Sequence, residues 1–211
     1  MWWWVCVVLA SEPASTDSDG SSVEAAPVTP TPTPEGEVPP VPRGPDQAEY
    51  NRLTQELESL AERNAWAGVE RTWVKLVATQ IAPSFRDLMF AANSARALGD
   101  TGAARERLLA AKNLQEDPSV FDWLFEIDQN YGAVRLECDP GVGWALTTEQ
   151  RPFQPDRIRS VEFAAEAVAS SCRFEGMLPV GTYDFCGAEL VVKAGLPPVH
   201  VDARGKAPPT K

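Results

Sequence analysis

The chain has 211 residues, with 19 Lys and Arg, 30 Asp and Glu and a single His, and its formal net charge is −11. Hydrophobic residues make up 44% of it, which is enough for a buried core, and the length allows one or two domains. Binding to the phosphate backbone of a nucleic acid needs clustered Lys and Arg, so the acidic balance argues against a nucleic-acid partner.

The first ten residues, MWWWVCVVLA, are apolar and uncharged. A membrane-spanning helix takes about 20 apolar residues, so this run is too short to cross a bilayer. It suits the apolar core of an export signal that ends at Ala10, although no Lys or Arg precedes it. We therefore expect residues 1–10 to direct export to the cell envelope, the periplasm or the outside. Membrane contact is expected only if this segment is retained or lipidated at Cys6, and an accidental apolar start is the alternative.

Residues 11–45 contain nine of the 19 prolines together with many Ser, Thr and Glu. This composition has no apolar period and cannot bury a core, so it predicts a disordered linker.

Helical periodicity begins at Asp46 and predicts a helical domain over residues 46–130. The helices are expected over about 46–63, 65–80, 84–98 and 101–114 and from Ser119 to about residue 130. Pro83 and Pro118 are expected to end the second and fourth helices, because proline cannot continue a helix. The residues predicted to face the core are Tyr50, Leu53, Leu57, Leu60, Val69, Trp73, Leu76, Val77, Phe85, Leu88, Ala91, Ala92, Ala95, Ala104, Leu108, Ala111, Val120, Trp123, Leu124 and Ile127.

The helices also repeat, since Pro83 and Pro118 are 35 positions apart. A period near 34 in helix-turn-helix units resembles the tetratricopeptide repeat. Residues 85–118 are the best copy, residues 50–83 are a weaker one, and residues 119–130 resemble a further first helix used as a cap. An ordinary five-helix bundle with chance spacing is the alternative.

The resemblance implies a concave groove, lined by the first helix of each repeat, that holds a peptide or a partner helix. The positions that correspond to the groove are Arg86, Met89, Asn93 and Arg96 in the better copy and Asn51, Thr54 and Glu58 in the weaker one. Two arginines beside Met and Asn could hold an acidic or C-terminal peptide. A solvated face without a ligand is the alternative.

The pattern changes after Tyr131 and predicts a small α+β module over residues 131–195. Val134, Leu136 and Cys138 alternate with charged residues, as in a half-buried strand. A helix is expected over 156–172 and a hairpin around Cys186-Gly187. The segment Leu178-Pro179-x-Gly181-x-Tyr183 resembles the edge of PEGA-like and carboxypeptidase-regulatory-like β-sandwiches. The proline-rich residues 196–211 are expected to be a flexible tail.

Three cysteines, Cys138, Cys172 and Cys186, lie in this second module. In an oxidising compartment two of them can pair. The candidate pair is Cys172 with Cys186, which would close a short loop and fix the helix end to the hairpin. The alternative is three reduced and buried thiols, and the pairing cannot be fixed by spacing.

The sequence holds no catalytic constellation. Its single histidine, His200, lies in the proline-rich tail, which argues against a Ser-His-Asp, Cys-His or multi-His metal site. We therefore expect neither a cofactor nor a metal, and we expect the protein not to be an enzyme. An enzyme built on carboxylates such as Glu149 and Glu162 is the weaker alternative.

These features together predict an α+β protein with a disordered arm, a short tetratricopeptide-like array and a small β-sheet or sandwich module with one inserted helix. We expect an exported, non-enzymatic scaffold that binds a protein or peptide of the cell envelope through the groove. The alternative is a module that binds a polysaccharide or a small ligand through Trp144, Phe153 and Tyr183.

Overall fold

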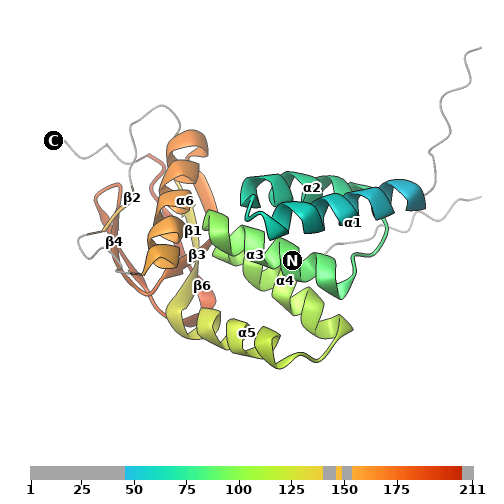
Figure 1. The fold of residues 1–211 in the computed structure, drawn as a ribbon. Helices are drawn as coiled ribbons and strands as arrows, with labels where there is room; N and C mark the ends of the chain where they lie inside the picture. Colours follow the sequence, from blue (N-terminus) through green and yellow to red (C-terminus); the bar gives the residue numbers. More distant parts are fainter. Residues whose placement is uncertain (1–45, 140–145, 149–153, 206–211) are drawn as a thin grey trace, which may run out of the picture. The chain divides into compact units, whose positions relative to one another are not determined.

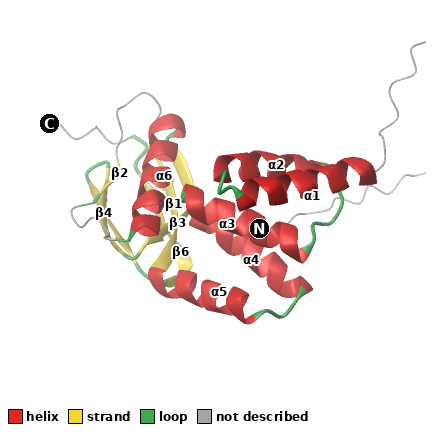
Figure 2. Ribbon diagram, in the orientation of Figure 1, coloured by secondary structure: helices red, strands yellow, loops and turns green. Residues whose placement is uncertain are grey.

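The computed structural model of the chain describes residues 46–139, 146–148 and 154–205. Five helices come first, and two small sheets with one further helix follow (Figures 1 and 2). All of these elements belong to one compact unit. The predicted α+β class is therefore confirmed. The expected export signal over 1–10 and the linker over 11–45 lie outside the described residues.

The first five helices, called the helical array below, are α1 (Gln47–Glu62), α2 (Trp66–Ala78), α3 (Phe85–Leu98), α4 (Thr101–Leu114) and α5 (Pro118–Asn130). The side chain of Asp46 caps α1, and Ser84 forms a capping box with Asp87 at the start of α3. Pro118 was predicted to end α4, but it is the first residue of α5. Its missing N–H costs nothing there, because the first N–H groups of a helix have no partner within the helix.

Most residues of the predicted apolar stripes are buried, and Tyr50, Leu60, Phe85 and Trp123 are partly buried against the core clusters. Leu53, Leu57, Val69 and Leu76 join residues of α3 and α4 in one core cluster. Val77 was expected on the same side of α2, but it is 48% exposed. The buried stripe of α2 passes through residues 69, 72, 73 and 76, and the next position turns away from it.

Alanines bring α3 and α4 close together. Ala91, Ala92, Ala95, Ala104 and Ala111 have almost no exposed surface. A larger side chain at these places would push the helices apart, because protein interiors have no spare volume.

A mixed sheet follows the array, in the strand order β3-β1-β6. Its strands are β1 (Tyr131–Glu137), β3 (Arg173–Pro179) and β6 (Gly195–Asp202). β3 runs antiparallel to β1 and β6 runs parallel to it. Val134 and Leu136 face the core with Phe174 and Leu178, as the alternation of β1 predicted.

Strand β6 corrects the prediction of a flexible tail from residue 196. Val199, His200, Val201 and Asp202 pair with β1. Pro197 and Pro198 argue against a central strand, but β6 is an edge strand. Its pairing with β1 shifts register between Gly195 and Val199, where the two prolines lie. Proline is compatible with an edge strand, because it is only in a central strand that its missing N–H removes a ladder bond.

A second, antiparallel sheet has the order β2-β4-β5. It consists of β2 (Leu146–Thr147), β4 (Gly181–Phe185) and β5 (Ala188–Val192), and the predicted hairpin is β4 with β5. Helix α6 (Pro155–Ser171) packs against β3 and β2. Ala164 and Val168 of α6 join the apolar faces of both sheets in a single core cluster, which is the core of the β-module below.

The array and the β-module share a packed boundary. Gly99 follows α3 directly beneath α6, where a Cβ atom would lie 2.3 Å from the carbonyl oxygen of Arg159. The hydroxyls of Thr101 and Ser160 are hydrogen-bonded at 2.8 Å, and both residues are buried. Met177 of β3 belongs to the same core cluster as α5. The two parts are therefore joined by apolar and polar contacts alike.

Candidate functional site

Arg86 and Asn51 are the predicted groove residues that are exposed. Arg86 lies in the first turn of α3, and its guanidinium forms an ion pair with Glu58 of α1. The guanidinium also lies 5.4 Å from the centre of the Phe90 ring. The side chain of Arg86 is 62% exposed and that of Glu58 is 31% exposed. Ion pairs as exposed as this one contribute little stability, so a carboxylate from a partner could replace Glu58.

Arg96 is partly exposed, and it is paired with acidic residues of two other helices. Its guanidinium contacts Asp156 of α6 at 3.0 Å and Glu126 of α5 at 3.3 Å. It also lies 5.2 Å from the centre of the Trp123 ring. Arg96 is therefore already paired within the protein, because the later helix α6 brings an acidic side chain to it.

The other predicted groove residues are partly engaged within their own helices. The Asn93 side chain donates to the backbone oxygen of Met89, and Asn51 accepts from Gln47. Met89 is half-buried between two core clusters, and Thr54 is half-buried as well. The groove thus reduces to a surface around Arg86 and Phe90 on α3 and Glu58 on α1, which we call the Arg86 surface.

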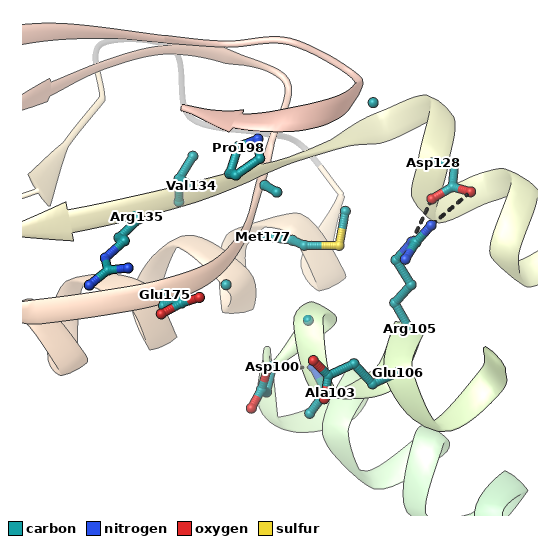
Figure 3. Close-up of a pocket in the computed structure, with 14 residues that line it drawn as sticks. Asp100, Ala103, Arg105, Glu106, Asp128, Val134, Arg135, Glu175, Met177 and Pro198 are labelled. Carbon is teal, nitrogen blue, oxygen red and sulfur yellow. Dashed lines mark hydrogen bonds and ion pairs between the residues drawn. The ribbon is translucent and has the colours of Figure 1, made fainter. Parts of the chain in front are cut away.

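A cleft of about 460 Å³ lies between the start of α4 and the outer face of the β3-β1-β6 sheet (Figure 3). Asp100 and Glu106 lie on its helical side, and Arg135 and Glu175 on the sheet side. Its volume is in the range of small-molecule sites. Gly102, Gly176 and Gly195 line it without side chains, which leaves room beside the backbone.

The charges of the cleft are unevenly paired. Arg105 donates to Asp128 at 2.7 Å, and Arg135 contacts Glu137 at 2.9 Å. Arg173 and Arg204 also contact Glu137, and the pKa of this carboxyl is lowered mainly by its hydrogen bond from Arg135. No hydrogen bond or ion pair joins Glu106 or Glu175 to another described residue. The cleft therefore has an excess of negative charge.

Sequence reasoning missed this cleft. Its residues come from α4, α5 and three strands, and one of these strands was expected to be a tail. The one signal within the sequence is the alternation Ala133, Arg135, Glu137 on β1, which places charges on the face opposite the core. That pattern indicated a wet face of a strand but not that a helix would lie across it.

Tyr183 and Glu162 are the residues of the two alternative functions that the structure describes. Tyr183 is only 3% exposed, and its hydroxyl donates to the backbone oxygen of Pro179, so it is not a surface platform for a sugar. Trp144, Phe153 and Glu149 lie outside the described residues. Glu162 lines a cavity of about 230 Å³ together with mainly apolar described residues of α6 and β2.

The three cysteines of the second module lie near one another. The side chain of Cys138 is hydrogen-bonded to that of Cys172. All three side chains contact the core of the β-module. In the described part of the chain no group of three or more His, Cys, Asp and Glu could hold a metal ion.

No family model, no curated protein and no solved structure matches this chain. The fold and the surfaces define it as an α+β protein in which a five-helix array is packed on a small β-module. Within the described ranges, no helix combines the length and the apolar character that a membrane span requires.

Proposed function

We propose that the protein is a non-enzymatic scaffold of the cell envelope that binds a protein or peptide through the Arg86 surface. The resemblance of residues 50–118 to tetratricopeptide repeats supports a binding role for the first helices of the array. The apolar start of the chain and the proline-rich segment after it support export and a tethered position.

The observation that carries this proposal is the exposed Arg86 between Phe90 and Glu58. A guanidinium on an aromatic ring presents its remaining N–H groups in a fixed orientation, which favours a carboxylate. An acidic side chain or a C-terminal carboxylate of the partner would take the place of Glu58. Phe90 would contact an apolar residue next to it.

The test compares partner capture from envelope extracts by four forms of the protein. The wild type and the Glu58→Gln variant should retain the partner, since Glu58 only competes for Arg86. Arg86→Glu should lose it by a factor of about 10 to 100, the range of a charge-assisted bond. The control is Arg71→Glu, an exposed arginine of α2 with the same change in charge. Equal capture by the Arg86 and Arg71 variants would refute the Arg86 surface, and a cytoplasmic location on cell fractionation would refute the envelope.

The cleft favours a second candidate, the binding of a small ligand by the β-module. The carboxylates of Glu106 and Glu175, which are not paired with any described residue, face the same space from opposite sides, and this suits a ligand with a cationic group. Peptides with Lys or Arg and amino sugars should shift NMR signals of Gly102 and Gly176. The double change Glu106→Gln with Glu175→Gln should abolish those shifts, whereas Glu189→Gln on the exposed side of β5 should leave them. If none of these ligands shifts the glycine signals, this candidate fails.

A further inference from the structure

Cys138 and Cys172 lie opposite each other at the end of an antiparallel ladder. Cys138 directly follows β1 and Cys172 directly precedes β3, and the last paired residues of the two strands are Glu137 and Arg173. The next position along this register joins the two cysteines. The backbone N–H of Cys138 donates to the carbonyl oxygen of Cys172 at 2.9 Å, so a backbone hydrogen bond joins the two residues just beyond the ladder. Cys172 itself ends α6 with φ of 53°, and its side chain is hydrogen-bonded to that of Cys138.

This placement meets the geometric needs of a disulfide. Residues directly opposite each other in an antiparallel pair have Cα atoms about 4.5–5.5 Å apart. Disulfides span Cα distances of about 4.4–6.8 Å. The two side chains also lie on the same face of the sheet, because both contact the core of the β-module. We propose that Cys138 and Cys172 form a disulfide when the protein meets an oxidising thiol–disulfide couple.

The surroundings indicate which thiol reacts first. Cys138 is buried, whereas Cys172 is half-buried and its Sγ donates to the backbone oxygen of Asp139 at 3.1 Å. A small disulfide such as oxidised glutathione therefore reaches Cys172 more easily. Burial, and after it the hydrogen bond with Cys172, raises the pKa of Cys138 to about 12. Its thiol thus stays protonated and unreactive toward outside reagents at neutral pH.

The reaction is a pair of exchanges. The Cys172 thiolate attacks one sulfur of oxidised glutathione and releases a glutathione thiolate, which takes up a proton. Cys138 then loses its proton and attacks the Cys172 sulfur of the mixed disulfide, and the second glutathione leaves. The protein loses two electrons and two protons, and oxidised glutathione gains them as two thiols.

The closed loop runs from β1 through α6 to β3. Helix α6 is the element that holds Arg96 through Asp156 and that covers Gly99. The disulfide would therefore fix the element that joins the β-module to the helical array. This inference rests on the contacts of the two thiols and not on the proposed function, so each can fail without the other.

The experiment uses the whole chain, first reduced and then equilibrated with oxidised and reduced glutathione. Free thiols are alkylated with a first reagent, and one part of the sample is digested without reduction to find linked peptides. The other part is reduced and alkylated with a second reagent, which marks the thiols that were in a disulfide. Trypsin places Cys138, Cys172 and Cys186 on three different peptides, since Arg159, Arg173 and Lys193 lie between or beside them. We expect one linked pair, the peptides of Cys138 and Cys172. Oxidation should raise Tm by an amount on the order of 10 °C.

Two variants separate this pair from other pairings. Cys186→Ser should keep the linked peptides and the rise in Tm, whereas Cys172→Ser should lose both. A linked pair that contains Cys186 would overturn the proposal. So would an oxidised wild type in which Cys138 and Cys172 are still alkylated by the first reagent and Tm is unchanged.

Discussion

At the scale of single residues, Asp87 is a buried carboxylate that joins two helices of the array. It is fully buried, and one of its oxygens accepts from the backbone N–H of Ser84 at 3.0 Å and from the Tyr50 hydroxyl at 2.7 Å. The same oxygen also accepts from the Ser84 hydroxyl. Asp87 therefore caps α3 and at the same time ties α1 to it.

We expect Asp87→Asn to lower the free energy of unfolding by about 1–3 kcal/mol. The amide oxygen can still accept in the place of Oδ2, but it carries no charge and forms weaker bonds, and the NH2 group would take the buried place of Oδ1, which has no hydrogen-bond partner among the described residues. Urea unfolding followed by circular dichroism measures the effect. Asp122→Asn, at an exposed position of α5, is the matched control and should change the free energy of unfolding by less than about 0.5 kcal/mol. Equal losses in the two variants would show that the network around Asp87 contributes nothing.

The three tyrosines give a second prediction at this scale, which concerns alkaline pH. Burial, and for Tyr50 also the hydrogen bond to Asp87, raises the pKa of Tyr50 and Tyr131, and burial raises that of Tyr183 to about 12. The folded state thus favours the neutral phenol. This contribution to stability is complete below the unfolded pKa near 10 and is lost as the pH rises through the folded values.

The measurement is the absorbance of tyrosinate at 295 nm against pH. The midpoint for the folded protein should lie above that of the same chain in urea, and folding should weaken over the range from about pH 10 to 12. Identical midpoints in the two states would contradict the burial of the phenols.

At the scale of elements, the contact of α3 with α6 depends on a residue without a side chain. Gly99 ends α3 with φ of 93°, a conformation in which other residues are strained. Its Cβ position would also collide with the carbonyl oxygen of Arg159 and touch Phe163. The end of one helix and the side of another meet at this one position.

Gly99→Ala should therefore destabilise the protein by clearly more than the strain alone. Gly205→Ala is the control, since Gly205 has φ of 73° and no atom near its Cβ position. The control should cost about 1 kcal/mol, and Gly99→Ala at least about 2 kcal/mol more. Thermal unfolding of both variants measures the difference. Equal Tm values for the two would mean that α6 can move away without cost.

The elements also show what the sequence could and could not predict. The helices of the array follow from apolar spacing and from caps such as Ser84, which are local signals. The error at β6 came from Pro197 and Pro198, whose effect depends on whether the strand is central or at an edge. Position within a sheet is a tertiary property, so no local pattern reveals it.

The dependence on tertiary packing also explains why the sequence did not predict the partners of Arg96 or the cleft. Arg86 meets Glu58 of α1, and the helical periodicity of the sequence placed both residues on helices. Arg96 meets Asp156, which lies 60 positions further along the chain, and the cleft joins α4 to strands that follow much later. Contacts between distant segments depend on how the elements pack, and periodicity alone does not fix that packing.

At the scale of the whole described unit, the array and the β-module should unfold together. Val120, Leu124 and Ile127 of α5 share a core cluster with Tyr131 and Met177. Separation would expose these apolar residues and leave Thr101 and Ser160 without each other. Both costs act against a state in which only one part is folded.

We therefore expect a single transition in calorimetry, with equal calorimetric and van't Hoff enthalpies. Hydrogen exchange read by mass spectrometry is the second probe. Protection of α3 and of β1 should be lost at the same denaturant concentration. Two separate transitions would show that the boundary between the parts is weak.

The position of β1 also has a consequence for synthesis. This strand lies at the centre of its sheet, yet both of its neighbours, β3 and β6, come later in the chain. The helices of the array can pair with neighbours made just before them while the ribosome is still at work. Strand β1 leaves the ribosome with both edges open, and its second edge is covered only once residue 202 has emerged. For that interval the nascent chain carries an apolar strand in need of a partner, and this is the stage at which a chaperone would matter most.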